Sequence, residues 1–221
     1  MASFFAFNNS VFCYAYSPVF IIIFIFYLIM INRNKCPKKV KIFFNITFVL
    51  LVIRYITVLL GILIESQSII YILRTMVLLN YSLIPLVALG TAYIFLRNED
   101  TKFDYNFIFM LILLLLYVGE LYLYKVNISI NNSFGFIINF KDSLTPNLIY
   151  LIVIASIAIV SLLCVDKPFC NKWGMKLLTI SLMLTIAEFI LFLGGIKFFP
   201  YPLIGEILIL LMSFKAIKTF K

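Results

Sequence analysis

The sequence predicts an all-α, polytopic membrane protein with seven transmembrane helices, its N-terminus outside and its C-terminus inside. Of the 221 residues, 64% are hydrophobic and only 12% are charged, and the mean hydropathy is +1.13. A soluble domain is usually about 45–50% apolar and about 25% charged. This chain has too few polar residues to cover a surface in water, so we expect residues 1–221 to form one membrane domain.

The predicted helices follow from apolar runs. Crossing about 30 Å of hydrocarbon takes about 20 helical residues. Seven runs come near that length: 11–32, 42–64, 69–96, 105–125, 147–165, 174–196 and 200–217. The third run is long and contains Pro85, which predicts a tilt or kink there because proline removes a helical hydrogen bond. Tyrosines near several run ends are typical of the headgroup zone: Tyr71, Tyr122, Tyr124, Tyr150 and Tyr201.

The basic residues predict the orientation. Thirteen of them fall in loops 33–41, 97–104 and 166–176 and in the C-terminal tail, whereas the opposite side carries only Lys125, Lys141 and Lys197. Basic loops stay in the cytoplasm, so the N-terminus faces out. This topology, with anionic lipid against the basic face, accounts for the net charge of +9 without a nucleic-acid partner.

The N-terminal "MASFFAFNNS" lacks the basic region of a cleavable signal peptide, so we expect the first helix to be an uncleaved anchor. The many Phe, Ile, Asn and Lys residues are typical of an AT-rich bacterial genome, and we expect the bacterial cytoplasmic membrane as the location.

Several chemistries are disfavoured. The chain has no histidine, which removes the commonest general base and metal ligand. Three of its four cysteines, Cys36, Cys164 and Cys170, lie at or near inner loops. We expect no metal site, no cofactor and no enzymatic activity. Glu99, Asp100 and Asp104 form an acidic group at the inner face, but Lys102 interrupts it, which favours a solvated loop over a lipid-processing metal site.

The longest loop, 126–146, faces outward and contains the apolar stretch "FGFIINF". Two interpretations stay open at this point. The loop folds into the interface or over the outer mouth of the bundle, or it is a tether that rests on the headgroups.

Charged residues within the apolar runs are the main functional signal. An ion in hydrocarbon costs at least about 2.5–3.5 kcal/mol, so such side chains normally face the bundle interior and pair. We place Arg54 near mid-membrane and the others toward the outer side, which predicts an outward-facing polar pocket extended by Asn80, Tyr55 and Tyr81. The alternative is that these ions only fix helix packing. The charged residues are Arg54, Glu65, Arg74, Glu120, Glu188 and Glu206.

Three segments carry a family resemblance: "YPLIG" at 201–205, "KAIKTF" at 215–220 and "NYSLIPLVALGTAYIF" at 80–95. They resemble the last and third helices of the seven-helix sensor region at the N-terminus of some bacterial histidine kinases. The matching positions in the last helix are Tyr201, Pro202, Leu203, Gly205, Ala216, Ile217, Lys218 and Phe220, with Ile204 as an extra residue. The resemblance implies a seven-helix sensor. In that family an output domain follows the seventh helix and none follows here, so we expect signalling through another protein.

Three functions fit these observations. The first is a sensor or receptor-like module that binds an extracellular small molecule or peptide through Arg54, Arg74, Asn80, Glu120, Glu188 and Glu206. Its partner would be a cytoplasmic or membrane signalling protein. The second is a small transporter or the substrate-binding subunit of one. The third is an immunity or accessory protein that occupies another membrane protein.

Overall fold

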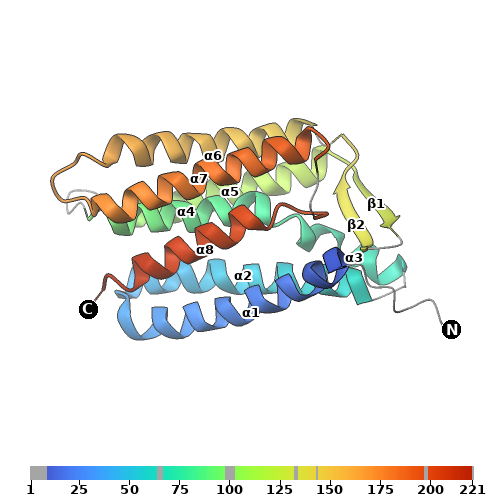
Figure 1. Ribbon diagram of the computed structural model, residues 1–221, viewed down its shortest axis with the longest axis horizontal. Coiled ribbons are helices and arrows are strands. Elements are labelled where there is room, and N and C mark those ends of the chain that lie inside the picture. Colours follow the sequence, from blue (N-terminus) through green and yellow to red (C-terminus); the bar gives the residue numbers. More distant parts are fainter. Residues whose placement is uncertain are drawn as a thin grey trace.

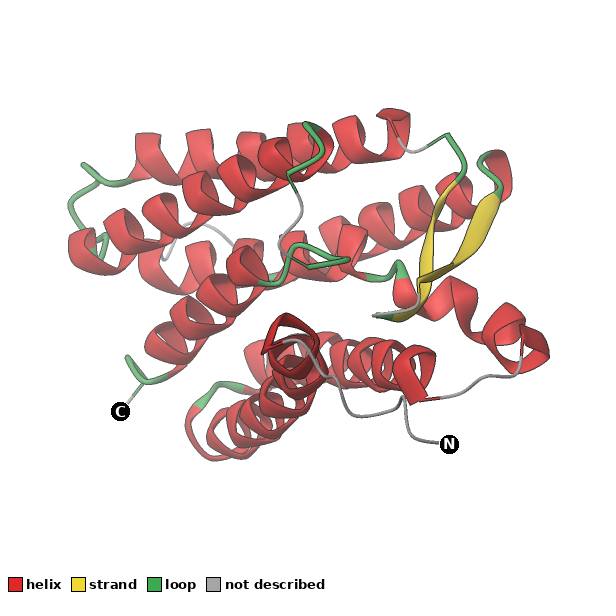
Figure 2. Ribbon diagram, turned by 45° about the vertical axis from the view of Figure 1, so that its right-hand side comes forward, coloured by secondary structure: helices red, strands yellow, loops and turns green. Residues whose placement is uncertain are grey.

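The computed structural model describes residues 9–63, 67–97, 103–131, 134–142, 144–196 and 199–220. The helices lie side by side along the long axis, and two strands lie at one end (Figures 1 and 2). The elements in chain order are α1 (Asn9–Lys35), α2 (Lys38–Leu63), α3 (Gln67–Val77), α4 (Asn80–Leu96), α5 (Asp104–Leu123), β1 (Val126–Asn131), β2 (Gly135–Phe140), α6 (Leu144–Cys164), α7 (Lys172–Leu193) and α8 (Ile204–Ile217).

Six segments in the described part of the chain are long and apolar enough to cross a membrane, and they match the first six predicted runs. Large apolar side chains such as Ile23, Leu115 and Ile152 are exposed on their outward flanks. Such flanks suit lipid and would form an unusually large apolar surface in water. The segments are Tyr14–Lys35, Lys38–Leu63, Ser68–Leu96, Asp104–Leu123, Leu144–Cys164 and Lys172–Leu193.

The seventh predicted run, 200–217, contains a shorter helix than expected. Only Ile204–Ile217 is helical, and these 14 residues extend about 21 Å at 1.5 Å per residue, less than the hydrocarbon thickness. Tyr201, Pro202 and Leu203 precede the helix in an irregular segment and are buried. In Figure 1, α8 begins part-way along α7 and ends at the opposite end of the bundle from the strands. The structure therefore does not confirm a seventh full span.

The third predicted run is interrupted, but not at its proline. The helix stops at Val77 and restarts at Asn80, and α4 continues through Pro85 without a break. Around the interruption, amides bond three residues back instead of four: Leu79 to Met76 and Tyr81 to Leu78. The break in this run therefore lies six residues before Pro85.

The helix after this break occupies the centre of the bundle. α4 packs against α2, α5, α6, α7 and α8. Its sequence is apolar all round, as a helix without a solvent or lipid face requires. Because α4 is surrounded in this way, its first residue, Asn80, lies inside the protein and is 4% exposed.

The loop after α5 forms an antiparallel hairpin that packs onto the end of the bundle. Its inner face buries Phe136, Ile138 and Phe140. Gly135 has φ +75°, and a β-carbon there would lie 2.7 Å from the carbonyl oxygen of Gly61 in α2. Glycine thus permits both the turn and the close approach. Of the two interpretations of this loop, folding over the bundle is the one observed.

Candidate functional site: a buried ion pair at an interrupted helix

The centre of the site is an ion pair between α2 and α8. The guanidinium Nη1 of Arg54 donates to the carboxylate Oε2 of Glu206. Both side chains are almost completely buried, with exposures of 0% and 1%. A single charge is costly in a buried, apolar environment unless it has a partner. Each of these two residues, far apart in the sequence, supplies that partner for the other.

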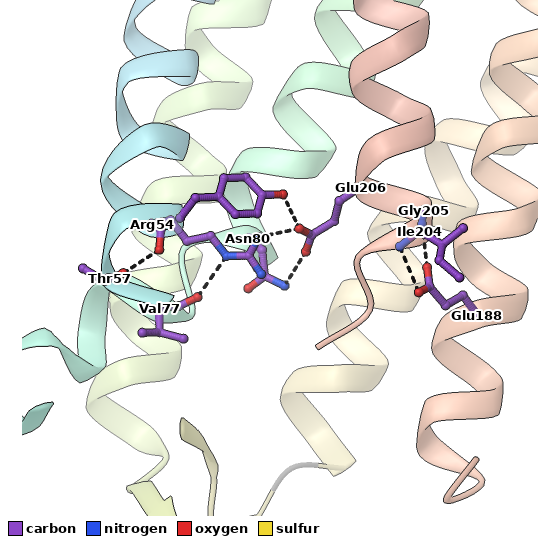
Figure 3. Close-up of polar contacts among 9 residues, drawn as sticks. Arg54, Thr57, Val77, Asn80, Glu188, Ile204, Gly205 and Glu206 are labelled. Atoms are coloured by element: carbon purple, nitrogen blue, oxygen red, sulfur yellow. Dashed lines mark hydrogen bonds and ion pairs between the residues drawn. The ribbon is translucent and has the colours of Figure 1, made fainter. Parts of the chain in front are cut away.

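Two further side chains complete the coordination of the Glu206 carboxylate. The Tyr55 hydroxyl donates to Oε2, and the Asn80 side-chain amide donates to Oε1 at 3.2 Å. Figure 3 shows Glu206 pointing from α8 toward α2, with Asn80 from the start of α4 beside it. Both carboxylate oxygens thus have donors, which is the condition for holding a charge in a low-dielectric interior.

The interruption between α3 and α4 supplies acceptors to the same region. In a regular helix the carbonyls of Thr75 and Val77 would accept from the amides of Leu79 and Tyr81, but those amides bond to Met76 and Leu78. Arg54 Nε donates to the Val77 carbonyl at 3.3 Å, and the Tyr117 hydroxyl of α5 donates to the Thr75 carbonyl. Side chains from two other helices therefore satisfy the carbonyls that the break releases.

One atom of the arrangement has no partner. The second terminal nitrogen of Arg54, Nη2, is buried and meets no hydrogen-bond acceptor among the described residues. A buried guanidinium N–H without an acceptor costs about 1–3 kcal/mol or more. The guanidinium therefore has one more donor than the described residues have acceptors for it.

Glu188 lies on the other side of α8 from Arg54 and has a different role. Its carboxylate accepts from the backbone amides of Ile204 and Gly205, at 3.0 and 2.6 Å (Figure 3). These amides open α8 and have no partner within the helix, so an acid here satisfies them and complements the positive end of the helix dipole. Gly205 also permits the close approach of α8 to α7, because a β-carbon there would lie 2.6 Å from Oγ1 of Thr185 in α7.

The segment before α8 is tied to the hairpin. The Tyr201 hydroxyl accepts from the Ile138 amide at 2.9 Å and lies 3.4 Å from the Ile138 carbonyl, to which it can donate. These two backbone groups belong to β2, so the Tyr201 hydroxyl provides hydrogen-bond partners at the edge of this strand. The Tyr201 hydroxyl therefore links the hairpin to the segment that precedes α8.

The structure separates the predicted pocket residues into groups. Arg54, Asn80 and Glu206 form the network. Glu188 caps α8, the helix that carries Glu206. Glu120 is buried in α5, and its Oε2 has no hydrogen-bond partner among the described residues. Arg74 lies apart from the network, stacked on Tyr71. Glu65 lies outside the described residues.

Other predicted groups also have defined places. Tyr55 joins the network, whereas Tyr81 bonds to the Asn147 side chain of α6. Of the acidic group predicted at the inner face, Asp104 pairs with Lys39 at 2.7 Å. Glu99, Asp100 and Lys102 lie outside the described residues.

Sequence reasoning missed the roles of Tyr117 and Tyr201. Tyr201 lies near a run end, where tyrosine is expected at the headgroups for its amphipathic ring alone, whereas Tyr117 lies inside the run 105–125. A signal was present for Tyr201, since it begins the "YPLIG" motif. Nothing in the sequence marked Tyr117, because the carbonyl it serves is released only by the break.

Comparison of this chain with protein-family models, with curated proteins and with solved structures finds no match. The interpretation of the site therefore depends on its own geometry and chemistry.

Proposed function

We propose that this protein is a ligand-responsive membrane module of the sensor or receptor type, which binds an extracellular small molecule or peptide and signals through a separate protein. We further propose that the hairpin end faces outside and that the end carrying the α1–α2 and α6–α7 connections faces the cytoplasm. The excess of basic residues at the latter end supports this orientation. The resemblance of "YPLIG" and "KAIKTF" to the last helix of histidine-kinase sensor regions supports the functional class.

The observation that carries the proposal is the incompletely satisfied Arg54. A purely structural ion pair is most stable when every donor has an acceptor. Here Nη2 of Arg54 has none among the described residues, while the pair sits where α2, α8 and the α3–α4 break meet. A ligand with a carboxylate or another strong acceptor would complete this set.

The mechanism would be a shift between two helix packings. A ligand changes such an equilibrium only by its differential affinity for the two states. An acceptor bound to Nη2 would also compete with Glu206 for the Arg54 guanidinium. This would weaken the hold of α2 on α8, and α8 would then move relative to α7. Because α8 ends at the proposed cytoplasmic face, a partner there would sense the movement.

A thermal-stability screen of the purified protein in neutral detergent tests this function. Carboxylate-bearing small molecules and short peptides would be compared on the native protein, on Glu206→Gln and on Lys39→Ala, which removes an ion pair at the other end of the molecule. Ligands of the site should stabilise the native protein and Lys39→Ala alike and should stabilise Glu206→Gln more strongly, because this variant lacks the carboxylate that competes for Arg54. Equal stabilisation of Glu206→Gln by every active ligand would contradict the assignment.

A transporter, or the substrate-binding subunit of one, is the second candidate, and two interrupted segments favour it. α3–α4 breaks inside the bundle and α8 begins part-way along α7, and transporters commonly build their sites from such discontinuous helices. Uptake of radiolabelled ligand into proteoliposomes distinguishes the candidates. A sensor shows binding without accumulation, whereas a transporter shows uptake that Glu206→Gln abolishes.

A further inference from the structure

A second polar site lies at the hairpin end of the bundle, separate from the Arg54–Glu206 network. A cavity of about 350 Å³ opens there between α3, the end of α5 and the start of β1. α3 lies beside the hairpin in Figure 1 and contacts β1. The cavity is lined by Tyr71, Arg74, Thr75, Leu121, Tyr122, Tyr124, Lys125 and Val126.

The lining is cationic. Arg74 and Lys125 supply two positive charges, and no acid is among the described residues that line the cavity. The two ion pairs found in the described part of the chain, Lys39–Asp104 and Arg54–Glu206, involve neither of them. Both charges are therefore available to an anion.

The position of the Arg74 guanidinium also suits an anion. Its central carbon lies 3.7 Å from the centroid of the Tyr71 ring, three residues earlier in α3. Stacking on an aromatic face holds the guanidinium plane by its π surface and leaves the N–H donors around its edge free. A planar fork of donors fixed in this way matches the paired oxygens of a phosphate.

We infer that this cavity binds a phosphate group, with Arg74 as the bidentate donor and Lys125 as the second charge. The phosphate could belong to a lipid headgroup or to a soluble molecule. Tyr71, Tyr122 and Tyr124 surround the cavity with rings typical of the membrane–water interface, the depth at which lipid phosphates lie. This inference does not depend on the proposed function, because the Arg54–Glu206 network contributes nothing to the cavity.

The test measures binding of two probes to the purified full chain in neutral detergent. Dihexanoyl phosphatidylglycerol and inorganic phosphate, each at constant ionic strength, would be titrated against the native protein and against Arg74→Gln/Lys125→Gln, with thermal stability and native mass spectrometry as readouts. Lys215→Gln/Lys218→Gln removes the same charge at the other end of the molecule and is the control. Arg74→Lys, which keeps the charge but loses the fork, is the fourth protein and serves if the double variant does not fold.

At least one probe should bind the native protein and the control equally, and about tenfold or more weaker to Arg74→Gln/Lys125→Gln, as expected for loss of charge-assisted hydrogen bonds. Arg74→Lys should bind with intermediate affinity. Binding of phosphatidylglycerol alone identifies a lipid site, and binding of inorganic phosphate identifies a site for a soluble phosphate. The inference is overturned if neither probe binds, if affinity is the same in all four proteins, or if Arg74→Lys binds like the native protein.

Discussion

The described part of the chain contains two ion pairs, each between a basic side chain and a carboxylate, in opposite environments. Arg54–Glu206 joins α2 to α8 with side chains 0% and 1% exposed, whereas Lys39–Asp104 joins α2 to α5 with side chains 62% and 53% exposed. In water the attraction between two such charges at 4 Å is about 1 kcal/mol, and salt screens it further. In the interior the attraction is larger, but removing both ions from water also costs more.

This difference shows what each pair can do. An exposed pair contributes about 0–1 kcal/mol and can form and break freely. A buried pair gives little net stability over an apolar replacement, yet losing one partner strands the other charge. Arg54–Glu206 is therefore suited to specifying which helices meet, and to responding when a competing acceptor arrives.

The largest effect is expected from Glu206→Ala. It leaves the Arg54 guanidinium buried without a counter-charge and removes the acceptor of Tyr55 and Asn80. We expect a loss of about 3–5 kcal/mol in the free energy of unfolding. Unfolding by sodium dodecyl sulfate in mixed micelles, followed by circular dichroism, measures it.

The double variant Arg54→Met/Glu206→Ala sharpens this measurement. Removing both charges abolishes the stranded ion, so the double variant should be more stable than Glu206→Ala alone. If Glu206→Ala costs less than about 1 kcal/mol, the buried pair behaves like an exposed one. The contrast between the two pairs would then be wrong.

A smaller effect is expected from Glu188→Ala. Glu188 is an acid of the same region whose partners are backbone amides of Ile204 and Gly205 instead of a cation. Losing this helix cap should cost about 1–2 kcal/mol. Glu188→Gln keeps one acceptor oxygen and should lose less than Glu188→Ala in the same titration. Equal losses for both variants would show that the amides do not depend on this acceptor.

The sequence predicted the helices well because each needs only an apolar run of sufficient length. It placed α8 less accurately, since 200–217 is apolar throughout and nothing in its hydropathy shows that helix starts only at Ile204. Pro85 drew attention to α4, but proline early in a helix is tolerated when the preceding turn adjusts. The actual break at Leu78–Leu79 has no turn residue to mark it.

The site was partly predictable for the same reason. The free-energy cost of a charged side chain in hydrocarbon identified Arg54 and Glu206 as residues that need partners. In the structure they pair with each other. The same argument grouped Arg74 and Glu120 with them, because hydropathy gives depth along a helix and not the direction in which a side chain points. Direction is fixed by packing around α4, which no single-sequence pattern contains.

Tyr117→Phe should give a still smaller effect. It removes the hydroxyl that serves the Thr75 carbonyl at the break and changes nothing else in the packing. We expect a loss of about 1 kcal/mol in the free energy of unfolding. Tyr122→Phe, on the same helix but 90% exposed, is the matched control and should change stability negligibly. Equal stability of the two variants would mean that the break does not depend on Tyr117.

The smallest effect is expected at the exposed pair. Lys39→Ala and Asp104→Ala each remove one end of a 2.7 Å contact whose side chains are more than half exposed. Water solvates the remaining charge, so each variant should lose less than about 1 kcal/mol. Raising the salt concentration in a non-ionic detergent should shrink the difference in thermal midpoint between the native protein and Lys39→Ala, because screening already weakens the native pair. Glu206→Ala should show no such convergence, since the stranded charge of Arg54 is buried and salt screens buried charges much less than exposed ones. A salt response of the same size in both variants would place the two pairs in similar surroundings, against the burial on which the comparison depends.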